Sequence, residues 1–415
     1  MNSTLVKSQN LNKNVIYILA YIIIFLVFMG TDFLKFNVNG INFNVAKIFM
    51  LIPSFILVID MVKEKKLKLN LNSKLLKYCI GFLIVWAIYS VITIYRNYDF
   101  TSYLIENFFL CIGAIDILFF IKHIDVKEAK NTIFGIITLA MSINCLYYIY
   151  LYYIEKINIG GFYHNINDLS TALILAILVS VNLIINYKGI KRIGICACLA
   201  IFIFTFASIS SRACILGVIF GFFAYLILNI IKYRKKFFNK KIFIFIVIIV
   251  LITCFIIGIL ALKKYLGKIS FSPIEDARTS NEIRTNLIFN GLEFLSRDLN
   301  WITGIGAGNS EFYLRNFSIY SIYEMYSFHN PILQIVVTYG IIIFLGFIIS
   351  YVIYLLLLYR MDSDFKGIAS VFLLFLLSLV IANISSSGLF TREWIWITFA
   401  IIISFINREG KEKIE

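Results

Sequence analysis

Three side chains suited to phosphate or proton chemistry interrupt an otherwise apolar sequence. Arg212 follows Ser208 to Ser211 in a very short turn between two apolar runs, and Arg284 lies early in a long polar segment. A guanidinium fixed at a membrane surface suits bidentate contact with a phosphate. His329 and Asn330 directly precede a long apolar run. A neutral imidazole in such a position can serve as a general base.

Each of these residues also has an ordinary structural explanation. Arg212 could be an interfacial anchor, and Arg284 could be a solvated helix charge, as most loop arginines are. Asn330 and Pro331 could simply begin a helix, because proline is favoured in the first helical turn. Such a helix start does not account for His329.

Four further polar residues lie in or beside apolar runs. Asn167 and Asp168 end a loop that leads into the sixth run. They could form turns and cap that helix, or hydrogen-bond sugar hydroxyls. Glu106 and Asp116 lie inside the fourth run, where a charge is costly. They suggest a polar interior or a proton path, which keeps a transporter open as an alternative.

The composition identifies an integral membrane protein. Apolar residues make up 60% of the 415 residues and charged residues 15%, against about 45–50% and about 25% in soluble domains. The net charge of +15 falls mainly in short loops between apolar runs. No basic face of the kind that binds nucleic acid is evident. The seven cysteines lie in or next to apolar runs without metal-site spacing, so neither a metal nor another cofactor is predicted.

The elements that must position these residues are membrane-spanning helices. About 20 apolar residues of helix cross a bilayer, and period-two alternation is absent. We predict an all-α fold with twelve spans, at residues 15–31, 45–62, 78–95, 104–121, 132–153, 169–187, 193–209, 213–231, 242–262, 330–358, 367–384 and 394–407.

Lysine and arginine are distributed unevenly between the two sets of connecting loops. Of 38 basic residues, 25 fall in the gaps on one side, and seven of the others lie in the single long interruption. Basic loops stay in the cytoplasm. We therefore expect both termini of this membrane protein in the cytoplasm, with the interruption outside.

The long interruption, residues 263–329, is expected to be a structured extracytoplasmic loop within one membrane domain, residues 1–415. Its apolar residues recur at helical spacing and predict an amphipathic helix with one apolar face. Arg284 and Glu293 should point away from that face. The glycine-rich stretch from Gly304 to Asn309 is neither a P-loop nor a dinucleotide fingerprint, and it is interpreted as a hinge. The apolar positions are Ile283, Leu287, Ile288, Leu292, Leu295 and Leu299.

The order and spacing of the polar elements, over residues 160–350, resemble the O-antigen ligase and Wzy-type polysaccharide polymerase superfamily. The pairing of His329-Asn330 with Gly340 is the most specific element, and the Ser-Ser-Arg turn is the next. The elements in order are Asn165-Ile166-Asn167-Asp168-Leu169, Ser208-Ile209-Ser210-Ser211-Arg212, Arg284, Gly304-Ile305-Gly306-Ala307-Gly308-Asn309, and His329-Asn330 followed by Gly340.

This resemblance implies a multi-span glycosyltransferase of the C-type architecture with an extracytoplasmic active site. Arg212 and Arg284 would contact the diphosphate of an undecaprenyl-diphosphate-linked glycan, and His329 would take the proton from the acceptor hydroxyl. Asn167, Asp168 and Asn330 would bind sugar or support the site. The reaction would be inverting and metal-independent.

The activity implied is polymerisation of lipid-linked repeat units for a capsular, O-antigen or cell-wall polysaccharide. Its partners would be membrane lipids and a chain-length regulator, with no nucleic acid. Two alternatives remain: an O-antigen ligase, which uses lipid A core as acceptor, and a flippase for the same lipid-linked sugar. A flippase does not require a long external loop.

Overall fold

The chain is an all-α, multi-pass membrane protein. The computed structural model describes residues 2–38, 41–65, 69, 71–163, 165–209, 211–237, 280–323, 325–328, 330–361, 367–382 and 392–412. Within these residues the helices are α1 (Asn2–Met29), α2 (Val45–Glu64), α3 (Lys74–Ile92), α4 (Phe100–His123), α5 (Val126–Tyr153), α6 (Ile166–Asn186), α7 (Gly189–Ile209), α8 (Arg212–Phe237), α10 (Ser280–Ser296), α11 (Asn300–Thr303), α12 (Ser310–Phe317), α13 (Pro331–Met361), α14 (Ile368–Ala382) and α15 (Glu393–Glu412).

Eleven of the twelve predicted spans coincide with observed helices. In the described part of the chain, eight helices are long and apolar enough to cross a membrane, and α14 and the apolar part of α1 are shorter. The twelfth predicted span coincides with α15. The predicted span 242–262 lies outside the described residues.

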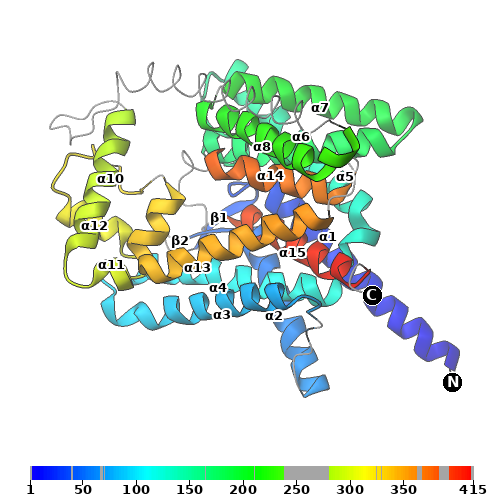
Figure 1. Ribbon diagram of the computed structural model, residues 1–415, viewed down its shortest axis with the longest axis horizontal. Helices are drawn as coiled ribbons and strands as arrows, with labels where there is room; N and C mark the ends of the chain where they lie inside the picture. The colour runs from blue at the N-terminus through cyan, green and yellow to red at the C-terminus, as the bar shows by residue number, and fades with distance from the viewer. Residues whose placement is uncertain are drawn as a thin grey trace.

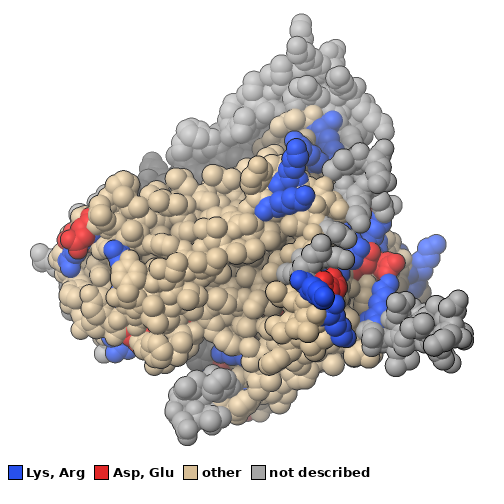
Figure 2. Space-filling model, turned by 90° about the horizontal axis from the view of Figure 1, so that it is seen from below, with Lys and Arg blue, Asp and Glu red and all other residues tan. Residues whose placement is uncertain are grey.

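The long axis of the molecule has two distinct ends. Figure 1 shows both termini at one end, here called the termini end, and helices α10, α11 and α12 at the other. We call residues 280–323 and 325–328 the arm, and the end that carries them the arm end. On the face shown in Figure 2, charged side chains gather towards the ends and leave a broad uncharged belt between them. That distribution is the one expected for a protein with a bilayer around its middle.

Polar contacts hold the helix ends together at each end of the bundle. At the termini end, Lys122 Nζ of α4 lies 3.0 Å from a carboxylate oxygen of Glu64 in α2. Lys127 Nζ of α5 lies 3.0 Å from Glu409 of α15. At the arm end, the backbone N–H of Asp32 donates to the carbonyl of Phe162, 2.7 Å away. These contacts join elements that are distant in sequence.

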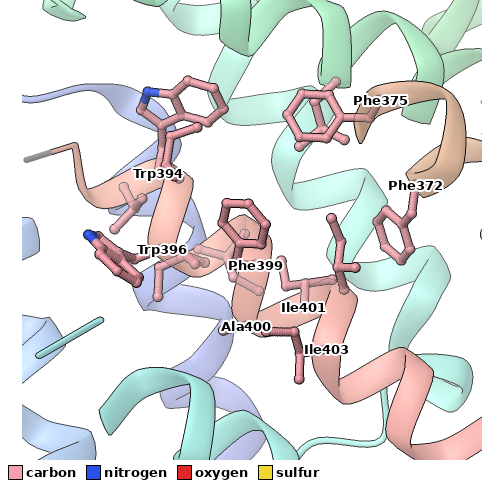
Figure 3. Packing of buried hydrophobic residues seen from close by; sticks show 14 of the residues in the cluster. Phe372, Phe375, Trp394, Trp396, Phe399, Ala400, Ile401 and Ile403 are labelled. Atoms are coloured by element: carbon pink, nitrogen blue, oxygen red, sulfur yellow. The ribbon is translucent and has the colours of Figure 1, made fainter. Parts of the chain in front are cut away.

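Helix α15 forms the centre of the apolar core. Its aromatic residues pack with Phe372 and Phe375 of α14, as Figure 3 shows. Trp396 lies against Gly113 of α4, where any larger side chain would overlap the indole ring. Ser404 Oγ donates to the carbonyl oxygens of Phe120 and Ile124, at 3.0 and 2.8 Å. The close approach of α4 and α15 therefore depends on Gly113, which leaves room for the Trp396 ring, and on Ser404, which bonds the backbone at the end of α4.

One short β-hairpin at the arm end was not predicted. Strand β1 (Lys35–Val38) pairs antiparallel with β2 (Ile41–Asn44) directly before α2. Asn44 caps α2 by accepting from the backbone N–H of Lys47 at 2.8 Å. The Asn44 amide donates to the carbonyl of Thr31 and to the carboxylate of Glu393, at 2.9 and 3.1 Å. The hairpin thereby links the starts of α2 and α15.

Candidate functional site

The arm has a hydrophobic core of its own. Nine buried residues from α10, the glycine-rich segment, α12, the segment between α12 and α13, and the first turns of α13 form a cluster separate from the core between the spans. Asn286 and Asn290 are fully buried and bind the segment between α12 and α13. Their amides donate to the carbonyls of Ser321 and Tyr320, at 2.7 and 2.9 Å. The arm is therefore a packed unit. The nine are Ile283, Leu287, Phe294, Ile305, Leu314, Ile322, Phe328, Leu333 and Val337.

Helix α10 is confirmed, but the prediction of a single apolar face was wrong. Ile283 and Leu287 are buried in the arm core, whereas Ile288 and Leu292 are exposed. Residues four apart share a face of a helix. Arg284 therefore lies on the same face as Ile288 and Leu292, so the expectation that it points away from the predicted apolar face was wrong too. The apolar residues of α10 therefore lie on two surfaces, one buried in the arm core and one exposed. The helical spacing of these residues could not distinguish the two surfaces.

The interpretation of Gly304 to Asn309 as a hinge was also wrong. Gly340 interrupts α13 with φ 80° and ψ 176°, a conformation open essentially only to glycine. This kink removes the helical donors to the carbonyls of Val337 and Thr338. The backbone N–H groups of Ile305 and Gly306 take their place, at 2.9 and 3.0 Å. The glycine-rich segment thus completes the backbone hydrogen bonds of α13 and fixes the arm to it.

A second set of bonds fixes the same segment to the ends of α3 and α4. Glu106 Oε2 accepts from the N–H of Gly308 at 2.5 Å, and its Oε1 accepts from the Tyr339 hydroxyl at 3.1 Å. Arg96 Nη1 donates to Thr303 Oγ1 and to the carbonyl of Gly304, at 2.7 and 2.9 Å. Glu106 is therefore engaged in holding the arm. Asp116, the other acidic residue of this helix, is fully buried.

Arg212 is the first residue of α8 and is exposed. Ser211 Oγ, immediately before it, donates to the Asn167 side-chain oxygen at 3.1 Å. Asp168 is fully buried, and its Oδ2 lies 2.8 Å from Arg392 Nε. Asn167 therefore joins the start of α6 to the turn that carries Arg212, before α8. Asp168 joins the start of α6 to Arg392, directly before α15.

Arg284 differs from the other arginines of the arm. Arg297 Nη2 lies 3.5 Å from Glu293, and Arg315 Nη2 lies 2.5 Å from Glu311. The Arg284 Nε is buried, yet it has no hydrogen-bond partner among the described residues. Burial lowers the pKa of this guanidinium, which still remains charged at neutral pH. A half-buried cation of this kind is suited to receive an anion.

Comparisons with known proteins point to the same part of the chain. A family model described as O-Antigen ligase matches residues 196–348. This range includes Arg212, Arg284 and Gly340. The resemblance to the O-antigen ligase and Wzy-type superfamily is confirmed. The chain is also similar to the teichuronic acid biosynthesis protein TuaE of Bacillus subtilis (strain 168), with 20% identity over 97% of this chain and 87% of that protein.

The residues to which the superfamily resemblance assigns roles lie in different parts of the structure. Arg212 begins α8 at the arm end, and Arg284 lies on α10 in the arm. Asn330 caps α13 by accepting from the N–H groups of Ile332 and Leu333, at 3.0 and 3.2 Å. Capping of α13 is therefore enough to account for Asn330 at this position. His329 lies outside the described residues.

Two arginines with structural roles at this end were missed in the sequence. Arg96 binds the glycine-rich segment, and Arg392 binds Asp168. Both lie in loops that are otherwise poor in basic residues, as Arg212 does. The reasoning that selected Arg212 therefore applied to them equally. Their acceptors lie more than 200 residues away, so only the folded structure identifies those roles.

Proposed function

We propose that this chain polymerises lipid-linked oligosaccharide repeat units. It transfers glycan from undecaprenyl diphosphate to a sugar hydroxyl of a second repeat unit at the arm end of the bundle. The observation that carries the proposal is Arg284, a half-buried guanidinium whose Nε has no partner among the described residues. The arm that carries it is fixed to α13 and α4 through Gly306 and Gly308.

The chemistry follows from the charge that develops on the leaving group. When the bond between the anomeric carbon and the diphosphate oxygen breaks, that oxygen takes the electron pair and the diphosphate gains negative charge. Arg284 and Arg212 stabilise this charge with donors that are already in place. His329 removes the proton of the attacking hydroxyl, whose oxygen forms the new bond from the opposite face. The result is inversion at the anomeric carbon, without a required metal.

Polymerase and ligase differ only in the acceptor. The relative TuaE is named for teichuronic acid biosynthesis and not for O-antigen, which favours the polymerase. The ligase is the second candidate, because the matching family model is described as O-Antigen ligase. Supplying a purified protein with either lipid A core or a second lipid-linked repeat unit separates the two.

The proposed topology places the arm end outside the plasma membrane and both termini in the cytoplasm. It rests on the distribution of Lys and Arg, since basic loops remain on the cytoplasmic side. In this topology residues 263–329 form the extracytoplasmic loop of a single membrane domain, and a chain-length regulator would act on the same side. A transporter is less well supported, because Glu106, one of the two residues that suggested it, accepts hydrogen bonds from Gly308 and Tyr339 and so holds the arm.

Replacing Arg284 tests the proposal in cells that lack the native gene. Arg284→Ala should leave single repeat units on lipid, because removing one fixed donor costs about 10²–10³ in rate. Arg284→Lys should retain the charge but lose bidentate contact, giving shorter chains than the wild type. Arg297→Ala is the matched control, since its surface pair with Glu293 is worth about 0–1 kcal/mol. Long chains from Arg284→Ala, at wild-type protein level, would contradict the proposal.

A further inference from the structure

The corner between α10 and α11 exposes two large apolar side chains. Leu299 directly precedes α11 and is 60% exposed, and Trp301 within α11 is 54% exposed. Between them Asn300 is buried, and its amide donates to the Phe294 carbonyl at 3.1 Å. The buried asparagine fixes the orientation of the turn. Leu299 and Trp301, here called the corner patch, are therefore held outward and no described residue covers them.

The corner patch lies at the level where the spans end. Two residues after Trp301, the carbonyl of Thr303 accepts a hydrogen bond from the Tyr89 hydroxyl, which belongs to the last turn of the α3 span. The carbonyl of Ile302 lies against Gly340, where the spanning half of α13 begins. The patch is thus fixed to the outermost turns of two spans.

The exposed surfaces of those two spans are apolar up to this level. Ile88 and Ile92 of α3 and Ile342 and Leu345 of α13 are all exposed, and their spacing places them on the lipid-facing sides of candidate membrane helices. The contacts of Ile302 and Thr303 hold the corner patch next to the outermost turns of these two helices. Tryptophan in particular is enriched at the boundary between acyl chains and headgroups, where its ring is accommodated on both sides.

We propose that the corner patch inserts into the adjacent bilayer leaflet and seats the arm on the membrane surface. Leu299 and Trp301 occupy the boundary between headgroups and acyl chains, and the arm core rests above them. A seated arm also keeps Arg284, on α10, near the depth of lipid phosphates. This last consequence rests on the proposed function, whereas the seating itself does not.

The four tryptophans make the insertion directly measurable. Trp86, Trp394 and Trp396 are 1–3% exposed, so Trp301 alone is open to its surroundings. The full chain is reconstituted in phosphatidylglycerol vesicles whose acyl chains carry bromine near the headgroup. The emission lost in Trp301→Phe defines the Trp301 signal. Seating predicts that bromine quenches this signal strongly. An unchanged Trp301 signal in brominated vesicles overturns the proposal.

A matched pair of variants separates insertion from a general change in the arm. Leu299→Glu places a charge at the corner patch and should remove most of the bromine quenching of Trp301. Ile319→Glu makes the same change at a residue that is 57% exposed and whose N–H binds Asn290, on another side of α10. It should leave the quenching unchanged. Equal quenching in both variants would contradict a seat at the corner. Because quenching requires no turnover, this result stands apart from the test of Arg284.

Discussion

Replacing Gly340 by alanine should detach the arm while leaving the spans intact. Gly340 has φ 80°, and a Cβ at this position would overlap the carbonyl oxygen of Ile302. The substitution therefore opposes both the kink in α13 and the approach of α11. The hydrogen bonds of Ile305 to Val337 and of Gly306 to Thr338 depend on that approach.

The cost follows from those contacts. Holding a non-glycine residue in this backbone region costs about 1–3 kcal/mol. Each of the two hydrogen bonds that the overlap breaks contributes about 0.5–1.5 kcal/mol. Docking of the arm should weaken by about 2–6 kcal/mol in total. At 1.4 kcal/mol per factor of ten, the lower limit corresponds to about 30-fold more of the undocked arm.

Amide hydrogen exchange measures this population directly. In Gly340→Ala, amides 300–310 should exchange about 30-fold faster or more, while those of α5 and α6 keep their wild-type rates. Gly135→Ala is the control, since a Cβ there meets nothing within 4 Å and alanine favours the helix. Wild-type exchange over residues 300–310 in Gly340→Ala would show that Gly340 does not hold the arm on α13. Equal acceleration in α5 would show that the effect is not confined to the arm.

Further substitutions test the contacts of three residues, Glu106, Asp168 and Asn330. Glu106→Ala leaves two donors without their acceptor, so it should destabilise the docked arm by about 1–3 kcal/mol, measured by the same exchange, with membrane insertion unchanged. Asp168→Ala should lower the free energy of unfolding by about 3–5 kcal/mol, because it leaves the Arg392 charge unpaired. Thermal unfolding measures this loss. The double variant that also carries Arg392→Ala should regain part of the lost stability. Asn330→Asp should keep both the helix cap and glycan polymerisation, whereas Asn330→Ala should lose about 1 kcal/mol of stability. Loss of polymerisation in Asn330→Asp would show that Asn330 acts chemically.

Hydropathy predicted the spans because that signal is local. A span needs about 20 apolar residues in succession, whatever lies elsewhere in the chain. Eleven predicted spans accordingly coincide with helices. The same signal also led to the polar interruption and to Arg284 within it.

Contacts between distant residues were beyond the sequence. Glu106 resembled part of a proton path because its partners, Gly308 and Tyr339, lie more than 200 residues further on. The glycines from 304 to 308 indicated freedom, yet their positive φ angles serve a fixed turn against Gly340. Period alone likewise assigned Ile288 to the same face as Leu287, although one is exposed and the other buried.

Release of the lipid carrier distinguishes polymerisation from transport of the intact lipid-linked glycan. The purified full chain in vesicles receives a glycan repeat unit linked to undecaprenyl diphosphate, and both products are quantified. A polymerase should release one undecaprenyl diphosphate for every repeat unit added to a growing chain, and Arg284→Ala should lose this turnover. Movement of the intact lipid-linked glycan across the bilayer, with no carrier diphosphate released, would contradict the proposed polymerisation.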